Sequence, residues 1–353
     1  MDITPYLKLT VEKEASDIFF TVGSTVRIKA AGKVIGVGKT ILTAETTQTI
    51  AQNIMTEEQR ALFEKELEID FAIGIPEIKA RFRVNAFRQQ EVVSIVMRYV
   101  KGKVPTLDEL GLPPILKDLI LHKRGLLLMV GATNSGKSTT LAAMINHRNE
   151  NQAGHILTIE DPIEIVHPHK KSLVNQRELG VDTRSYVRAL MSAMRESPDV
   201  ILIGEIRDQK TMAAALELSN TGHLAISTLH ANNAYQAMKR VINMFSQEQH
   251  QQLFMDLSLN LVSVISQRLV LGVKGGRVGA VEVMINTPYI ADLILKGKVE
   301  DIKEAMVSSG AEGMQTFDSA LFDLYKEGKR TLEETLANAD SRTNLQAKIT
   351  CGR

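Results

Sequence analysis

The chain has 353 residues, of which 44% are hydrophobic and 24% are charged. These proportions exclude a disordered or fibrous protein, and the length favours two domains. The 42 Lys and Arg residues are balanced by 41 Asp and Glu residues, which disfavours a dedicated nucleic-acid-binding protein, so we expect no nucleic-acid partner. The single cysteine, Cys351, excludes an intramolecular disulfide and a Cys-rich zinc site, which fits a reducing cytoplasm.

The hydropathy pattern predicts neither export nor a membrane span. Residues 1–10 carry charges and a proline where a signal peptide has an uninterrupted apolar stretch. Apolar runs such as Leu126–Val130 are much shorter than the roughly 20 residues of a membrane helix. We therefore expect a cytoplasmic protein whose contact with a membrane is peripheral.

The first part of the chain, residues 1–100, predicts a small α+β domain. Apolar and polar residues tend to alternate in short runs, which indicates strands. The predicted strands are Ile18–Val22, Val26–Ala30, Ile69–Ile73, Ala80–Phe87 and Val92–Arg98, and the predicted helix is Ala44–Glu66. Residues 101–114 contain two glycines and three prolines without periodicity, so we place a linker and possible hinge there.

From residue 115 to 353 the pattern predicts an α/β domain. Strands and helices alternate, which favours a parallel sheet covered by helices. The predicted strands are Leu126–Val130, Ile156–Ile159, Val200–Ile203 and Leu224–Thr228, with helices from Lys137, near Arg184–Arg195 and near Lys210–Asn220. Beyond residue 250 the chain is predicted to be mainly helical, with a hairpin around Gly275 and Gly276. The predicted helices there are Thr287–Lys296, Val299–Ser308 and Thr316–Lys326.

The segment from Gly131 to Thr139 has the pattern of a phosphate-binding loop between a strand and a helix. Two glycines permit close approach of the backbone, Lys137 places a cation on the β and γ phosphates, and Ser138 offers a hydroxyl to magnesium. The expected ligands are therefore ATP and Mg²⁺. The candidate nucleotide-binding residues are Thr133, Asn134, Ser135, Gly136, Lys137, Ser138 and Thr139. An ordinary glycine turn is the alternative.

Acidic residues follow two of the predicted strands. Glu205 follows Val200–Ile203, where a carboxylate is expected to hold magnesium directly or through water. Glu160 and Glu164 follow the strand Ile156–Ile159, and ligands gather where parallel strands present their carboxyl ends. We predict that Glu160 binds nucleotide and that Glu164 orients the attacking water. Solvated strand ends and an acidic surface turn are the alternatives.

His223 and His230 lie at the two ends of the predicted strand Leu224–Thr228. Either imidazole is a candidate sensor of a γ phosphate, with His230 assigned to catalysis and His223 to nucleotide binding. Structural histidines are the alternative.

Three motifs together resemble the secretion ATPase superfamily. They are Ile159–Glu164, Ile203–Asp208 and Gly222–Asn232, which match its acidic, Walker B and histidine boxes in order. The segments Ala15–Ile18 and Ala80–Phe87 are similar to the PAS-like domain of the pilus retraction ATPases of the PilT and PilU family. The resemblance implies a PAS-like domain, a RecA-like ATPase domain, and a hexameric ring at the cytoplasmic face of the inner membrane.

The same resemblance assigns a role to the N-terminal arginines. In that family, arginines of the first domain supply positive charge to nucleotide bound by the second. Arg81, Arg83 and Arg98 match those positions. Alternatively, these arginines form one solvated strand face.

One missing module and one altered helix narrow the resemblance to a single branch of the family. Related assembly motors carry a tetracysteine zinc module that a single cysteine cannot build, which favours retraction. Tyr289–Lys296 lacks both arginines of the matching helix in PilT-like members, which favours the PilU branch and an accessory role. The implied partners are further copies of the chain, a PilT-like ATPase and an inner-membrane pilus platform protein.

Two other classes of protein remain as alternatives. A P-loop kinase needs an acceptor pocket and a lid, for which the sequence offers no candidate. A ring subunit that binds nucleotide without hydrolysis is disfavoured by Lys137, Glu164 and Glu205. A GTPase is excluded because the Asn-Lys-x-Asp segment that reads guanine is missing.

Overall fold

The computed structural model describes residues 1–351 except 31, 79, 101, 103 and 274. The chain divides into two compact units, Met1–Lys103 with Glu164–Val166, and Val104–Ile163 with His167–Arg353. Positions 101 and 103 of the expected linker and position 274 of the expected hairpin lie outside the described residues. From Val104 onward the expected linker belongs to the second unit, where Leu107 and Leu112 are buried in the core.

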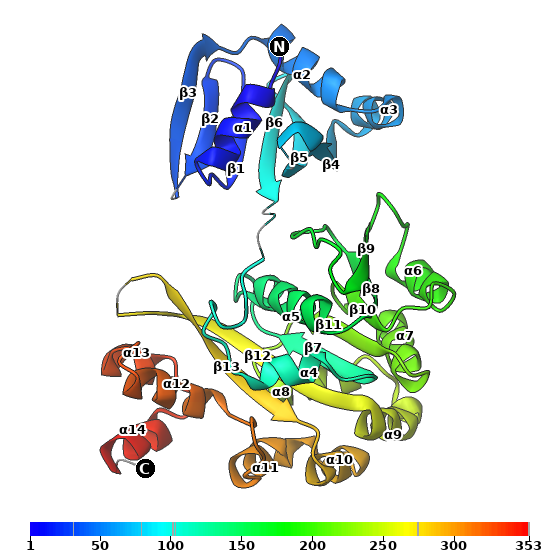
Figure 1. Ribbon diagram of the computed structural model, residues 1–353, viewed down its shortest axis with the longest axis vertical. Coiled ribbons are helices and arrows are strands. Elements are labelled where there is room, and N and C mark those ends of the chain that lie inside the picture. The colour runs from blue at the N-terminus through cyan, green and yellow to red at the C-terminus, as the bar shows by residue number, and fades with distance from the viewer. Residues whose placement is uncertain (31, 79, 101, 103, 274, 352–353) are drawn as a thin grey trace. The chain divides into compact units, whose positions relative to one another are not determined.

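The N-terminal unit is built on a six-stranded antiparallel sheet of order β3-β2-β1-β6-β5-β4 (Figure 1). Its strands are β1 (Asp17–Phe20), β2 (Thr25–Ala30), β3 (Lys33–Ile41), β4 (Glu68–Ile75), β5 (Ala80–Gln89) and β6 (Val92–Val100). Alternate residues such as Phe82, Val84 and Met97 are buried on one face. The sequence did not predict β3, because it contains two glycines and is exposed along almost its whole length.

Helices α1 (Thr4–Glu12), α2 (Ala44–Ile54) and α3 (Glu57–Glu66) contribute buried side chains to that core. The prediction of one helix over Ala44–Glu66 is wrong. The chain leaves the helical conformation at Met55, and the Thr56 hydroxyl then accepts from the Gln59 backbone N–H while the Gln59 side chain accepts from the Thr56 N–H. This reciprocal cap starts a second helix and ends the first.

The second unit contains a seven-stranded sheet of order β13-β12-β7-β11-β10-β8-β9. Its strands are β7 (Gly125–Val130), β8 (Gly154–Glu160), β9 (Ser172–Glu178), β10 (Val200–Ile203), β11 (Leu224–Leu229), β12 (Leu261–Leu271) and β13 (Arg277–Ile285). All neighbours are parallel except the hairpin of β12 and β13. The predicted parallel sheet is thus confirmed. Strands β12 and β13 confirm the predicted hairpin around Gly275 and Gly276, but they are much longer than expected in a region predicted to be mainly helical.

Helices cover both faces of this sheet (Figure 1). They are α4 (Ile115–Ile120), α5 (Lys137–Asn151), α6 (Tyr186–Ala193), α7 (Gln209–Asn220), α8 (Ala234–Ile242), α9 (His250–Asn260), α10 (Pro288–Leu295), α11 (Ile302–Ser308), α12 (Phe317–Lys326), α13 (Leu332–Ala337) and α14 (Arg342–Cys351). Along β7, Leu127 and Met129 pack with α4 and α5, whereas Leu126 and Leu128 pack with the core under α6 to α10. A strand buried on both faces reads as a continuous apolar run, which is why its sequence predicted it.

Within the described ranges, no helix combines the length and the apolar character needed to cross a membrane.

Candidate functional site

The predicted site residues of the second unit gather at one edge of its sheet. Strands β7, β11, β10 and β8 are neighbours and run parallel, so their carboxyl ends meet at that edge. The loop 131–136 follows β7, His230 follows β11, Glu205 lies just beyond β10, and Glu160 ends β8. Topology therefore brings together groups that lie far apart in the sequence.

The loop 131–136 has a backbone that requires glycine at two positions. Gly131 and Gly136 have φ values of 154° and 88°, and Asn134 has a φ of 62°. A β-carbon on Gly131 would lie 2.5 Å from the Gln267 carbonyl oxygen, and one on Gly136 would lie 2.8 Å from Gln267 Nε2. Both space and conformation therefore exclude a side chain at either glycine.

The loop leads directly into α5, whose first residue is Lys137. The Lys137 ammonium donates to the carbonyl oxygens of Gly131 and Ala132, each at 2.8 Å, so the cation lies over the loop. In the part of the chain that the structure describes, the buried hydroxyl of Ser135 has no hydrogen-bond partner. A helix start, a cation and a buried hydroxyl without a partner are the features that receive a phosphate group.

The remaining loop positions differ in exposure. Thr133, Asn134 and Ser138 are exposed, whereas Thr139 is half-buried. An exposed hydroxyl at Ser138 is accessible to a metal ion, and the exposed backbone at 133–134 is accessible to a phosphate chain.

Glu205 is held by two cationic or potentially cationic groups. Arg207 Nε donates to its Oε2 at 2.7 Å, and His230 Nε2 lies 3.1 Å from its Oε1. The Glu205 side chain is 16% exposed, whereas those of Arg207 and His230 are 64% and 43% exposed, so the carboxylate is shielded although its partners are not. The hydrogen bond to Glu205 raises the pKa of Arg207 above its ordinary value. The carboxylate thus has a fixed orientation at the strand end.

Glu160 and Glu164 lie in different surroundings. Glu160 Oε1 accepts from the Thr158 hydroxyl at 2.6 Å and from Gln176 Nε2 at 3.1 Å, which anchors it at the end of β8. Glu164 follows the cis peptide bond Asp161–Pro162 and is exposed, on the segment 164–166 that belongs to the first unit. The structure therefore fixes Glu160 at the sheet edge, and Glu164 lies four residues beyond the end of β8, on an exposed segment.

Sequence reasoning missed Tyr186, the first residue of α6. Its hydroxyl oxygen lies 2.8 Å from the position of a β-carbon on Gly204, so a side chain just before Glu205 would displace Tyr186. Burial, followed by the nearby Asp161 carboxylate, raises the pKa of Tyr186 above its ordinary value. A single tyrosine outside the motifs gives no signal in the sequence. The Thr228 hydroxyl donates to the Gly204 carbonyl at 2.6 Å and further fixes this turn.

The structure does not bring His223 to the site edge. His223 precedes β11, whereas His230 follows it, so the two histidines are at opposite ends of the strand. The His223 backbone carbonyl accepts from Gly125 N–H at the start of β7, and its Nδ1 lies 3.2 Å from the Leu218 carbonyl oxygen. Its position in this unit therefore gives no support to the predicted contact with nucleotide.

The three arginines of the first unit that were assigned to the site share one face of its sheet. Arg83 on β5 pairs directly with Arg98 on β6, and Arg81 lies two residues before Arg83 on the same face. Arg98 Nε donates to Asp17 Oδ1 at 2.9 Å, and Arg83 lies 3.7 Å from Asp70. We call Arg81, Arg83 and Arg98 the arginine face. Arg88 points to the opposite side, where it pairs with Glu64 at 2.7 Å.

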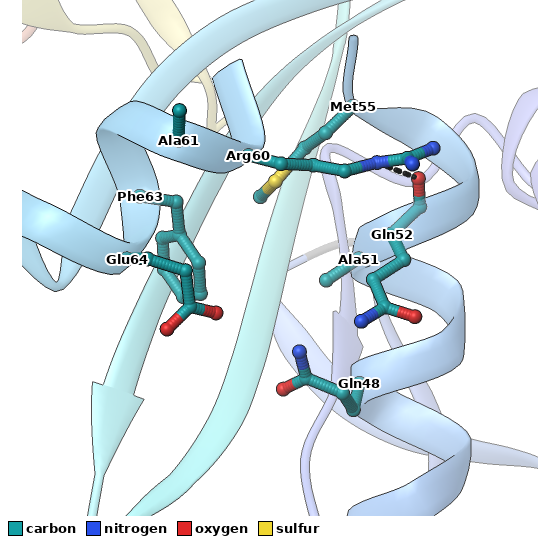
Figure 2. A pocket seen from close by; sticks show the side chains of 8 residues that line it. All are labelled: Gln48, Ala51, Gln52, Met55, Arg60, Ala61, Phe63 and Glu64. Carbon is teal, nitrogen blue, oxygen red and sulfur yellow. Dashed lines mark hydrogen bonds between the residues drawn. The ribbon is translucent and has the colours of Figure 1, made fainter. Parts of the chain in front are cut away.

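A cavity of about 190 Å³ lies between α2 and α3 of the first unit (Figure 2). Arg60 reaches across it and donates from Nε to the Gln52 carbonyl at 2.9 Å. The other lining residues are Gln48, Ala51, Met55, Ala61, Phe63 and Glu64. None of the residues predicted to take part in the site lines this cavity.

Comparison with known proteins gives the family. A family model described as type II/IV secretion system protein matches residues 1–335. The chain belongs to this family. It is 49% identical over 353 residues to the type IV pilus ATPase PilU of Pseudomonas aeruginosa, covering 100% of this chain and 92% of that relative. It is 44% identical over 345 residues to the pilus retraction ATPase PilT of the same organism, covering 98% of this chain and 100% of the relative.

The family likeness extends to the solved structures. The crystal structure of the pilus retraction motor PilT with bound ADP has a TM-score of 0.91 and 38% identity, and covers 98% of this chain and 99% of that chain. The family model includes both the first unit and most of the second. The arginine face and the sheet-edge site therefore both lie within the part of the chain that the family shares.

Proposed function

We propose that this protein is an ATP-hydrolysing motor of type IV pilus retraction that acts as a hexameric ring. The observation that carries the proposal is the gathering of the loop 131–136, the Glu205–His230 pair and Glu160 at one sheet edge. Its support from relatives is the similarity over the whole chain to PilU and PilT of P. aeruginosa. The fold we assign is a PAS-like first unit and a RecA-like second unit.

Nucleotide binding follows from the chemistry of the loop. The Lys137 ammonium, now on the carbonyl oxygens of Gly131 and Ala132, would move to the β and γ phosphates, for which the loop oxygens are weaker partners. Backbone N–H groups at the start of α5, with the hydroxyls of Ser135 and Thr139, would donate to the inner phosphates. The solved PilT relative holds ADP in its crystal structure, which supports a nucleotide as the ligand.

Magnesium is the metal that the donor set fits. Ser138 and Glu205 offer oxygen ligands, which Mg²⁺ prefers together with phosphate oxygens and water. Bound there, Mg²⁺ would neutralise charge between the β and γ phosphates. Glu164 is proposed to orient the attacking water, and His230, 3.1 Å from Glu205, is proposed to sense the γ phosphate.

The arginine face is proposed to supply positive charge as hydrolysis places negative charge on the phosphate. Opening and closing of the two units relative to each other would convert this chemistry into motion of an inner-membrane pilus platform protein, at the cytoplasmic face of that membrane.

The test is phosphate release by the purified ring. Lys137→Ala removes the phosphate-binding cation, and we expect release to fall at least about a hundredfold. Lys123→Ala, an exposed lysine of the same unit, serves as the control and should leave release unchanged. Wild-type rings that release no phosphate would refute the motor and support a ring subunit that only binds nucleotide.

Experiments in cells test whether this protein retracts pili without a PilT-like relative. Helix α10 (Pro288–Leu295) lacks the arginines of the PilT-like helix, so we propose a PilT-dependent accessory role. Retraction would be scored by pilus imaging in cells with this protein alone, a PilT-like relative alone, and both. Retraction by this protein alone would contradict the accessory role but not the motor.

A further inference from the structure

One buried residue lies against both ends of the phosphate loop. Gln267 on β12 is 3% exposed. The register of β12 with β7 pairs Ser266 with Val130, so Gln267 follows just where the loop begins at Gly131. Its carbonyl oxygen packs against Gly131 and its Nε2 against Gly136. A single residue of a neighbouring strand thus contacts the first and the last glycine of the loop.

The side chain of Gln267 is also tied to α5. The Thr140 hydroxyl donates to Gln267 Oε1 at 2.7 Å, and Thr140 is 1% exposed. Thr140 N–H donates to the Gly136 carbonyl at 3.0 Å. The buried hydrogen bond between Thr140 and Gln267 therefore connects the first turn of α5, the end of the loop and β12.

We propose that Gln267 is a positioning residue that holds the loop 131–136 in the shape that receives phosphate, acting through Thr140. This inference rests on the nucleotide site proposed above. Neither residue is a ligand in it, because both are buried beneath the loop.

The physical reason is the backbone of the loop. The conformations of Gly131, Asn134 and Gly136 in the loop are only some of those open to glycine and asparagine in a free peptide, so the loop shape has to be selected. Without this brace, which is the hydrogen bond between Gln267 and Thr140, the loop adopts the receptive shape for only a fraction of the time. The apparent Kd then rises by the inverse of that fraction. Once nucleotide is bound, the phosphate contacts are the same, so kcat changes little.

The test measures binding of N-methylanthraniloyl-ADP and steady-state ATP hydrolysis by the full-length protein. Thr140→Val removes the donor, keeps the shape and leaves Gln267 Oε1 unpaired. We expect its Kd and its KM for ATP to rise about tenfold, with kcat within about twofold of wild type. Thr140→Ser restores the hydroxyl and should return Kd to within about twofold of wild type.

A double-mutant cycle identifies the pair. Gln267→Leu removes the brace without an unpaired acceptor, and we expect Kd to rise about fivefold. Thr140→Val combined with Gln267→Leu should raise Kd by less than the product of the single effects, because neither partner remains unpaired.

The control is Thr335→Val in α13. Thr335 is also buried, and its hydroxyl donates to the Thr331 carbonyl at 2.7 Å. It should lower the melting temperature as a buried hydroxyl loss does, but leave Kd unchanged.

Three results distinguish failure of the brace from failure of the nucleotide site. If wild-type protein binds the probe and both Thr140→Val and Gln267→Leu keep its Kd, the brace is refuted while the nucleotide site stands. If the variants lose kcat with Kd unchanged, the brace is refuted as well. Wild-type protein without affinity for the probe would refute the nucleotide site itself.

Discussion

The sheet edge of the second unit and the arginine face of the first unit place charge in opposite ways. At the edge, Glu205 is 16% exposed and fixed by contacts from two segments. On the arginine face, the side chains of Arg83 and Arg98 are 41% and 69% exposed, and each has one carboxylate neighbour. Preorganised, shielded charge acts strongly on a bound group, whereas exposed charge is screened until another surface covers it. The shielded site is formed where parallel strands end, whereas the exposed arginine face is formed by side chains on neighbouring strands of a sheet.

The largest expected effect tests the shielded side of this comparison. Glu205→Gln keeps the size of the side chain but removes its charge, so Arg207 and His230 lose their common partner. We expect phosphate release to fall about a thousandfold while N-methylanthraniloyl-ADP still binds. The exposed Glu217→Gln on α7 should be without effect. Near-normal release by Glu205→Gln would mean that the edge carboxylate is not preorganised for the reaction.

The pH dependence of stability tests the burial of a histidine in the same unit. Burial, with a further contribution from Lys170, lowers the pKa of His167 from 6.5 to about 4. The unfolded chain therefore takes up a proton near pH 6.5 and the folded chain only near pH 4. Protons favour unfolding between these values, so the free energy of unfolding falls by up to about 3 kcal/mol as the pH drops from about 6.5 to about 4.

His167→Gln should remove this part of the slope in urea unfolding measured across that pH range. His122→Gln, an exposed histidine of the same unit, should keep the wild-type slope. An unchanged slope in His167→Gln would show that this histidine titrates alike in both states.

The smallest effect tests the exposed side. Arg83→Ala should lower phosphate release about tenfold without changing nucleotide Kd, because a partly screened cation is lost from the arginine face. The difference in phosphate release between Arg83→Ala and wild type should become smaller in high salt, because salt screens an exposed cation. Arg88→Ala is the matched control, since Arg88 lies on the other face of the same strand and pairs with Glu64. An equal loss of phosphate release in Arg83→Ala and Arg88→Ala would show that the arginine face has no role of its own in the reaction.

The sequence predicted what depends on local order and chain direction. The apolar run Leu126–Val130, the glycine pattern after it and the carboxylate after Val200–Ile203 are each complete within a few residues. His223 was assigned to the site although it precedes its strand. In a parallel sheet the start and the end of a strand lie at opposite edges, so the direction of the chain already separated it from His230.

Other features were not predicted, either because a signal in the sequence was overlooked or because no local pattern carries one. Thr56 and Gln59 have the spacing of a reciprocal helix cap, which was a readable signal for the break in Ala44–Glu66. By contrast, contact of Gln267 with the loop depends on the register of β12 against β7, and the position of Tyr186 depends on the path of the chain after β9. No local pattern encodes such pairings, because they arise between segments that are far apart in the chain.

The exposed edge strand β3 has a consequence for the protein in concentrated solution. Its open backbone and the exposed side chains of Val34, Ile35 and Ile41 would let strands of other molecules add to it. Lys33 and Lys39 place charge on this edge, and the register shift opposite Thr25, beside Gly38 with a φ of 80°, interrupts its regular pairing. Protection against aggregation at this edge therefore depends on two lysines and one bulge.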